Sequence, residues 1–173
     1  MKRSKKPTVA DIPHVGRGTP AGEWFRRYWI VVSAARDLHD IPKAIKILGE
    51  DLVLFRDQAE TIGLIGAHCP HRGANLFWAR NEDCGLRCVY HGWKFDTNGT
   101  CVDMPNEPAE SDFKTRVRAK AYPTQERGGV IWAYLGPRSD PPPLPDLEAN
   151  LAPEADRSIR AVQLDCNWLQ VLE

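Results

Sequence analysis

Two short segments of the sequence each combine a cysteine with a histidine, side chains that bind transition metals through sulfur and nitrogen. The first is Cys69-Pro-His71, the second is Cys88-Val-Tyr-His91, and residues 72–87 lie between them. Together they offer two thiolates and two imidazoles, and a glycine closely follows each histidine. The four side chains therefore form a candidate metal site that two similar loops would hold.

Two kinds of metal site fit this set of ligands. A zinc ion takes two sulfurs and two nitrogens in tetrahedral geometry. A [2Fe–2S] cluster of the Rieske type has two cysteines on one iron and two histidines on the other. The common zinc-finger arrangement places a cysteine pair before a histidine pair, whereas here each segment supplies one of each, so that two equivalent loops can both reach both irons. This order favours the cluster, with a structural zinc site as the alternative.

The residues around the ligands strengthen the interpretation as a cluster. The segments HCPHRGANL (68–76) and CVYHGWKFD (88–96), followed by Gly99, resemble the Rieske signature of ring-hydroxylating oxygenases. The resemblance implies that the cysteines share one iron and the histidines the other: Cys69 and Cys88 on the first, His71 and His91 on the second.

The resemblance also suggests roles for the other loop residues. Pro70, Gly73 and Gly92 would shape turns that bring backbone amide groups near the cluster sulfurs. Arg72 and Trp93 would cover the cluster.

The loops also bear on the reduction potential. Cytochrome bc-type Rieske proteins have an additional cysteine in each loop, where this sequence has Ala74 and Tyr90, and a hydroxyl donor where it has Trp93. Two neutral imidazoles in place of two anionic thiolates make a cluster easier to reduce, and Rieske potentials span about −150 to +300 mV. We expect a potential at the low end of this range.

Composition limits the other function classes. The 173 residues contain 23 Lys+Arg and 23 Asp+Glu, so no overall field favours nucleic acid or an anionic membrane. No apolar run reaches the ~18–20 residues of a membrane helix, and the basic start lacks the apolar stretch of a secretory signal. Five cysteines, an odd number, beside histidines point to metal binding in a reducing cytoplasm. Cys84, Cys101 and Cys166 are predicted to be buried or strand residues, while His14 and His39 are predicted to be solvated.

The elements that must position the two loops are predicted to be short strands. Strand-like runs occur at 28–32, 44–48, 52–55, 61–68, 85–95, 116–122 and 129–136, and turn signals such as Asn98-Gly99 separate them. Thr19-Pro20 is expected to cap a short helix. The pattern predicts an all-β fold: a Rieske-type antiparallel sandwich or barrel with a small cluster-binding subdomain.

The chain divides into four parts by composition. Residues 1–18 are predicted to be a solvated N-terminal tail, and residues 19–136 the Rieske domain. Residues 137–157, which are rich in proline, would be an extended connector. Residues 158–173 would begin a truncated catalytic domain, with a strand at 158–165 and a helix capped by Asn167 with Gln170 in capping-box position.

The resemblance extends beyond the cluster to almost the whole chain after about residue 14. Segments such as GTPAGEWFRRYW, CVDMPNEP and NWLQVLE resemble the α (oxygenase) subunit of the phthalate dioxygenase-like branch. In that family a catalytic domain follows, with a mononuclear iron(II) held by two histidines and a carboxylate. No histidine follows His91 here, so the chain alone is expected to be inactive as an oxygenase and to be an N-terminal fragment.

The resemblance implies partners as well. A flavin and iron–sulfur reductase using NAD(P)H would deliver electrons, neighbouring subunits would form a homotrimer, and the parent enzyme would hydroxylate an aromatic substrate. A free-standing Rieske ferredoxin, which carries electrons and is not an enzyme component, is the alternative function. The four basic residues at alternate positions in 114–120 would share one strand face, either as a docking patch for an acidic partner or as a solvated face.

Overall fold

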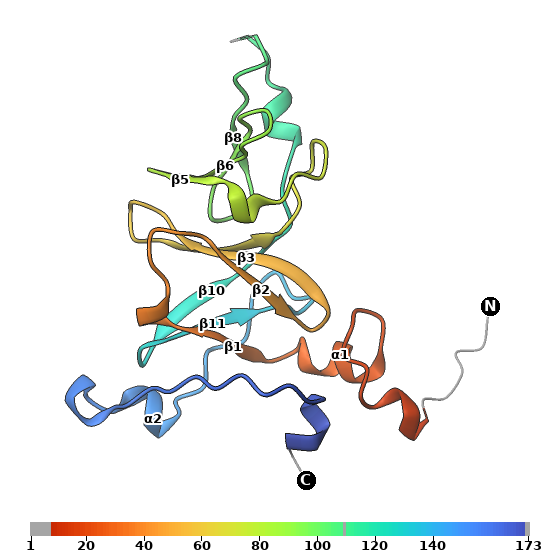
Figure 1. The fold of residues 1–173 in the computed structure, drawn as a ribbon, viewed down its shortest axis with the longest axis vertical. Helices are drawn as coiled ribbons and strands as arrows, with labels where there is room; N and C mark the ends of the chain where they lie inside the picture. Colours follow the sequence, from red (N-terminus) through yellow and green to blue (C-terminus); the bar gives the residue numbers. More distant parts are fainter. Residues whose placement is uncertain (1–7, 109, 172–173) are drawn as a thin grey trace.

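The computed structural model describes residues 8–108 and 110–171, and the described residues form three antiparallel sheets stacked along the long axis (Figure 1). The upper sheet has the order β5–β6–β7–β8: β5 (Arg80–Glu82), β6 (Gly85–Arg87), β7 (Lys94–Phe95) and β8 (Cys101–Asp103). The middle sheet has the order β2–β3–β4–β9: β2 (Lys43–Ile47), β3 (Glu50–Arg56), β4 (Ile62–Gly66) and β9 (Ala121–Tyr122). The lower sheet has the order β1–β11–β10: β1 (Trp29–Ala34), β11 (Val130–Tyr134) and β10 (Thr124–Arg127). The predicted all-β class is confirmed.

The middle sheet separates two hydrophobic cores. Alternate side chains of a strand point to opposite faces, so Val53 and Phe55 of β3 join the upper core, while Leu52 and Leu54 join the lower one. All four side chains are at most 1% exposed. This explains why the LVLF run is continuously apolar: both faces of the strand are buried. The upper core includes both loop cysteines, Cys69 and Cys88. The cysteine side of the candidate site is therefore packed against buried apolar side chains.

Tight turns join the strands, as the sequence predicts, with one shift of register. Gly128 and Gly129 both have positive φ and connect β10 to β11. The β2–β3 turn uses Leu48 (φ 47°) and Gly49 (φ 77°), so it begins at the last residue of the predicted run 44–48 and not after it. Two consecutive residues with positive φ are typical of a type I′ hairpin, whose twist matches that of the strands.

Gly99 closes the predicted hairpin between β7 and β8, and its replacement by alanine is expected to destabilise the protein by about 1–3 kcal/mol. Its φ is +77°, and a Cβ there would lie 2.3 Å from the carbonyl oxygen of Ala119. Urea unfolding measures the change. Gly66→Ala is the control, because a Cβ at Gly66 would make only ordinary contacts, at 3.5 Å from Lys120. Equal losses in the two variants would contradict this account.

The helix α1 (Pro20–Phe25) begins as predicted: the Thr19 hydroxyl accepts a hydrogen bond from the Gly22 N–H at 3.1 Å. The segment before it is folded where the structure describes it. A 3-10 helix spans Val9–Asp11, and the Thr19 hydroxyl donates to the His14 carbonyl at 2.7 Å. Residues 8–18 are therefore mostly exposed, as predicted, but they are folded locally and not a free tail, and residues 1–7 lie outside the described residues.

Two predicted strands are wrong. Residues 158–165 are exposed along most of their length and form no strand. Residues 113–116 form a 3-10 helix, and only an isolated bridge between Arg118 and Thr100 precedes the short strand β9. Three of the four basic side chains are also engaged: Arg116 with Asp112, Arg118 with the Asn98 carbonyl and Lys120 with Glu50. The proposed single basic face of residues 114–120 does not form.

The proline-rich segment lies along the lower sheet and contains regular structure, contrary to a purely extended connector. The Trp29 indole donates to the Pro142 carbonyl at 2.7 Å, and Leu144 is only 5% exposed. The short helix α2 (Glu148–Leu151) and a 3-10 turn (Glu154–Asp156) follow. Near the end, Asn167 Oδ1 accepts from the Leu169 N–H, and Trp168–Val171 forms a 3-10 turn where an α-helix was predicted.

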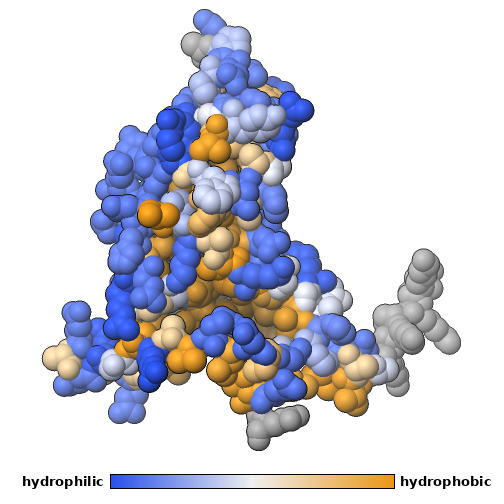
Figure 2. All heavy atoms as spheres, viewed as in Figure 1, coloured by the Kyte–Doolittle hydropathy of each residue, from blue (hydrophilic) through white to orange (hydrophobic). Residues whose placement is uncertain are grey.

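The outer surface of the lower part is rich in apolar side chains. Figure 2 shows apolar residues along the lower edge of the molecule, whereas the upper tip is mostly hydrophilic. Trp24 is 54% exposed, and the neighbouring Phe25 contacts Trp168 edge to face with ring centroids 4.9 Å apart.

None of the helices in the described ranges is both long and apolar enough to cross a membrane.

Candidate metal centre

The two cysteine–histidine loops have the same backbone hydrogen-bond pattern. In the first loop, the Cys69 N–H donates to the Ala74 carbonyl at 2.8 Å, and the Gly73 N–H donates to the Cys69 carbonyl at 2.9 Å. The first loop joins β4 to the 3-10 helix Leu76–Trp78, while the second joins β6 to β7.

The second loop repeats this pattern position for position. The Cys88 N–H donates to the Trp93 carbonyl at 2.9 Å, and the Gly92 N–H donates to the Cys88 carbonyl at 3.0 Å. Gly73 and Gly92 have φ of 73° and 76°, which only glycine adopts without cost. The expectation that two equivalent loops present one cysteine and one histidine each therefore has a structural counterpart.

The four candidate ligands are arranged as two pairs. Cys69 and Cys88 are 3% and 4% exposed and close enough to influence each other's ionisation. The rings of His71 and His91 lie above them toward solvent, with centroids 4.5 Å apart. Across the described ranges, no three or more Cys, His, Asp or Glu side chains gather around one point. A cysteine pair and a histidine pair match the ligand set of a binuclear cluster, with two cysteines on one metal and two histidines on the other.

The thiol environment suits a bound cation. Burial raises the pKa of the Cys69 thiol to about 11, helped by Cys88 and opposed by hydrogen bonds from the backbone N–H groups of His71 and Arg72. A thiol in this setting stays protonated at neutral pH unless a metal replaces the proton. The same two amide groups would donate to a sulfur that carries metal, as the turn around Pro70 and Gly73 was predicted to allow.

The imidazoles are held by aromatic neighbours. Trp93 from the second loop is 7% exposed and stacks on His71 of the first, with ring centroids 4.3 Å apart and planes 11° from parallel. The Tyr90 ring lies 3.9 Å from that of His91. Arg72 is exposed and sits over Tyr90, with its guanidinium carbon 6.0 Å from the ring centroid. The Trp93–His71 stack thus ties one loop to the other.

Partial burial and the nearby charges of His71 and Arg72 lower the pKa of His91 below its usual value. A neutral imidazole is the form that binds metals. The Asn106 side chain donates to the His91 carbonyl at 3.2 Å. The sequence analysis did not anticipate this contact, because no spacing rule connects these two positions.

The remaining cysteines and histidines lie outside the centre. Cys101 is buried in β8, as predicted, whereas Cys84 and Cys166 are exposed, contrary to the prediction. Cys84 lies in the turn between β5 and β6, and Cys166 follows an irregular exposed segment. His14 and His39 are exposed, as predicted.

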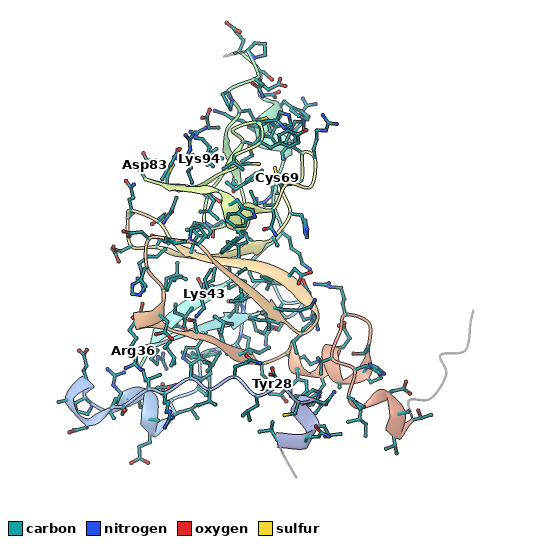
Figure 3. The ribbon with its side chains drawn as sticks, in the orientation of Figure 1. Tyr28, Arg36, Lys43, Cys69, Asp83 and Lys94 are labelled. Atoms are coloured by element: carbon teal, nitrogen blue, oxygen red, sulfur yellow. The ribbon has the colours of Figure 1, made fainter. Side chains whose placement is uncertain are left out.

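Arg87, directly before Cys88, was also missed by sequence analysis. Its guanidinium contacts Glu82, Asp103 and the Gly92 carbonyl of the second loop. Figure 3 places Cys69 and Lys94 in the same upper part of the molecule, with Asp83 at its edge. Arg87 is adjacent to a candidate ligand in the sequence, which is the only signal that could have found it.

Comparison with known proteins agrees with this geometry. Residues 28–123 match the family described as the Rieske [2Fe-2S] domain. The 3-chlorobenzoate-3,4-dioxygenase oxygenase subunit of Comamonas testosteroni is 46% identical over 165 residues, which cover 94% of this chain and 38% of that protein. The phthalate 4,5-dioxygenase oxygenase subunit of Pseudomonas putida is 40% identical over 157 residues, 89% of this chain and 36% of that protein. The chain thus spans little more than a third of the length of these relatives.

A solved structure gives the same result for the fold. The reduced complex between oxygenase and ferredoxin in carbazole 1,9a-dioxygenase aligns with a TM-score of 0.62 and 31% identity, over 76% of this chain and 33% of that chain. The cofactor of the matched family is a [2Fe–2S] cluster, as predicted. With the antiparallel fold, the paired loops and a family match over more than half of its length, the chain belongs to the Rieske [2Fe-2S] domain family.

Proposed function

We propose that this chain is the electron-transfer domain of the oxygenase component of an aromatic ring-hydroxylating mono- or dioxygenase. Its cluster ligands would be Cys69 and Cys88 on one iron and His71 and His91 on the other. One observation carries the proposal: two loops of identical backbone pattern bring a buried cysteine pair and a more accessible histidine pair together.

The burial of the ligands suggests the direction of electron flow. A [2Fe–2S] cluster held by these four residues would supply one-electron transfer. The cysteines join the upper core, while His71 is exposed and His91 is half-buried. The imidazole edges would therefore be the side of the centre that a partner can reach, where the outward ring N–H can hydrogen-bond to an acidic group of a neighbouring protein.

The partners of the site follow from the same proposal. The solved neighbour is an oxygenase in complex with ferredoxin, which supports an electron-transfer protein as the donor here. We propose an NAD(P)H-dependent flavin and iron–sulfur reductase as that donor, and a homotrimer of oxygenase subunits as the assembly, located in the cytoplasm. The acceptor would be a mononuclear non-haem iron. The resemblance places its two histidines after the Rieske domain, and no histidine follows His91, so they would come from residues outside these 173.

The proposal predicts the metal content of the purified protein. We expect about two irons and two acid-labile sulfides per chain, a red-brown colour and the EPR signal of a Rieske centre after reduction. The potential should lie near the low end of the Rieske range, about −150 mV. Anaerobic purification, metal analysis and EPR measure these quantities. A colourless protein that contains zinc would overturn the proposal.

A further inference from the structure

We propose that Arg87 is a positioning residue that holds the second cluster loop in place and adjusts the charge around it. This inference rests on the proposed ligand set, because Arg87 acts through the loop that contains Cys88 and His91. Its side chain is 18% exposed.

The guanidinium of Arg87 ties three strands to the loop. Its Nε donates to both carboxylate oxygens of Glu82 on β5 at 2.9 Å, and its Nη1 donates to Asp103 Oδ2 on β8 at 2.7 Å. The same Nη1 donates to the Gly92 carbonyl at 2.7 Å. A planar guanidinium can make these bonds together, with its one Nε–H shared between the two Glu82 oxygens and its two Nη1–H groups directed to Asp103 and Gly92, whereas a lysine ammonium cannot reproduce this fixed geometry.

Gly92 is the residue through which the bond acts on the ligands. It follows His91 directly, has φ of 76°, and its N–H closes the loop onto the Cys88 carbonyl at 3.0 Å. The Gly92 carbonyl belongs to the peptide between Gly92 and Trp93, so fixing it from outside restrains the peptide plane one residue after His91, in the loop that Gly92 closes onto Cys88.

The first loop lacks this support. The residue equivalent to Arg87 is His68, which is exposed and bridges to Asn75. In the part of the chain that the structure describes, the Gly73 carbonyl accepts no side-chain hydrogen bond. The two loops have the same backbone pattern, and the second differs in the side-chain hydrogen bonds that its carbonyls accept, from Arg87 at Gly92 and from Asn106 at His91.

The charges around Arg87 should also influence the reduction potential of the proposed cluster. Glu82 and Asp103 each face its guanidinium, and the 5%-exposed Lys94 also contacts Glu82, at 3.3 Å. Removing the guanidinium leaves two carboxylates without their main partner next to the loop. A more negative surrounding disfavours the reduced cluster, so its potential falls.

The test compares Arg87→Met, Arg87→Lys and wild type as purified proteins. We expect Arg87→Met to lose iron to a chelator at least about tenfold faster, a difference of about 1.4 kcal/mol, with a lower potential and an altered EPR spectrum. Arg87→Lys keeps the charge without the fixed directions of the guanidinium N–H groups. It should therefore retain a potential close to that of wild type and lose iron at an intermediate rate.

Arg56→Met is the matched control. Arg56 is 20% exposed, pairs with Glu126 at 2.7 Å and donates to the Glu60 carbonyl at 3.2 Å, but it lies on β3, outside the loops. Its replacement should reduce overall stability and leave the rate of iron loss, the potential and the EPR spectrum unchanged. Unchanged iron loss in Arg87→Met, or equal effects in Arg56→Met, would overturn the inference. Wild-type protein without a Rieske signal would instead overturn the proposed function.

Discussion

Replacing Cys88 with alanine is expected to give a colourless protein with fewer than about 0.2 irons per chain, in place of about two. The proposed cluster needs both thiolates on one iron, and Cys69 alone cannot hold it. Both irons are lost together, because the histidine pair binds only an iron that the bridging sulfides also hold. Iron analysis and the visible spectrum of the variant measure the loss.

Cys101→Ala is the control for this substitution. Cys101 is as buried as Cys88, at 2% against 4% exposed, and lies on β8 of the same upper sheet. Its thiol bonds weakly to the Asp103 carbonyl at 3.5 Å, so its loss should cost about 1 kcal/mol as a small cavity and leave the iron content unchanged. Iron retained in Cys88→Ala, or lost equally in Cys101→Ala, would contradict the ligand assignment.

The parts of the fold that the sequence predicts correctly have local causes. The LVLF run of β3 is apolar on both faces because it lies between two cores, and such a run is visible without any structure. The hairpins are marked by residues that accept positive φ, such as Gly99 and Gly129. The two loops are recognisable because each places a cysteine, a histidine and a glycine within five residues of the sequence.

The failures concern features that depend on distant partners. Residues 158–165 alternate like a strand, but an isolated strand has no stability without a neighbour to bond with, and none pairs with them in the described structure. Residues 114–120 have a basic residue at every second position, which is typical of a strand with one basic face. In the structure, however, Lys120 pairs with Glu50, 70 residues away. The Arg87 contacts join β5, β6 and β8, so they depend on sheet order, which side-chain alternation within one strand does not reveal.

Glu50→Gln is expected to lower the free energy of unfolding at pH 7 by about 3 kcal/mol, because it leaves a buried charge without its partner. Arg26 is only 2% exposed and donates to Glu50 Oε1 at 2.8 Å. Tyr122 donates to Glu50 Oε2 at 2.6 Å, and Lys120 bonds to the same oxygen. The remaining partners of Arg26 are backbone carbonyls, among them that of Leu48 at 3.0 Å, and these cannot neutralise the guanidinium. Urea unfolding at pH 7 measures the loss.

The effect should also depend on pH. Burial alone would raise the pKa of Glu50, but hydrogen bonds from Lys120, Tyr122 and Arg26 outweigh it and lower the pKa from 4.5 to about 2. A carboxylate whose pKa is lower in the folded state stabilises the protein above its unfolded pKa, and the stabilisation is lost as the pH falls through the folded pKa. The difference between wild type and Glu50→Gln should therefore be complete above about pH 5 and shrink towards pH 2.

Asp51→Asn, one residue further along β3, separates this effect from a general loss of negative charge. Asp51 pairs with Lys46 at 3.2 Å, and both side chains are more than half exposed. Exposed pairs of this kind contribute little, so the variant should stay within about 0.5 kcal/mol of wild type at every pH. If Glu50→Gln were equally mild, or its effect did not change between pH 5 and pH 2, the Arg26–Glu50 pair would not be what holds α1 to the β2–β3 hairpin. The position of β3 beneath the two cysteine–histidine loops would then depend on apolar packing alone, because side chains of β3 belong to both hydrophobic cores.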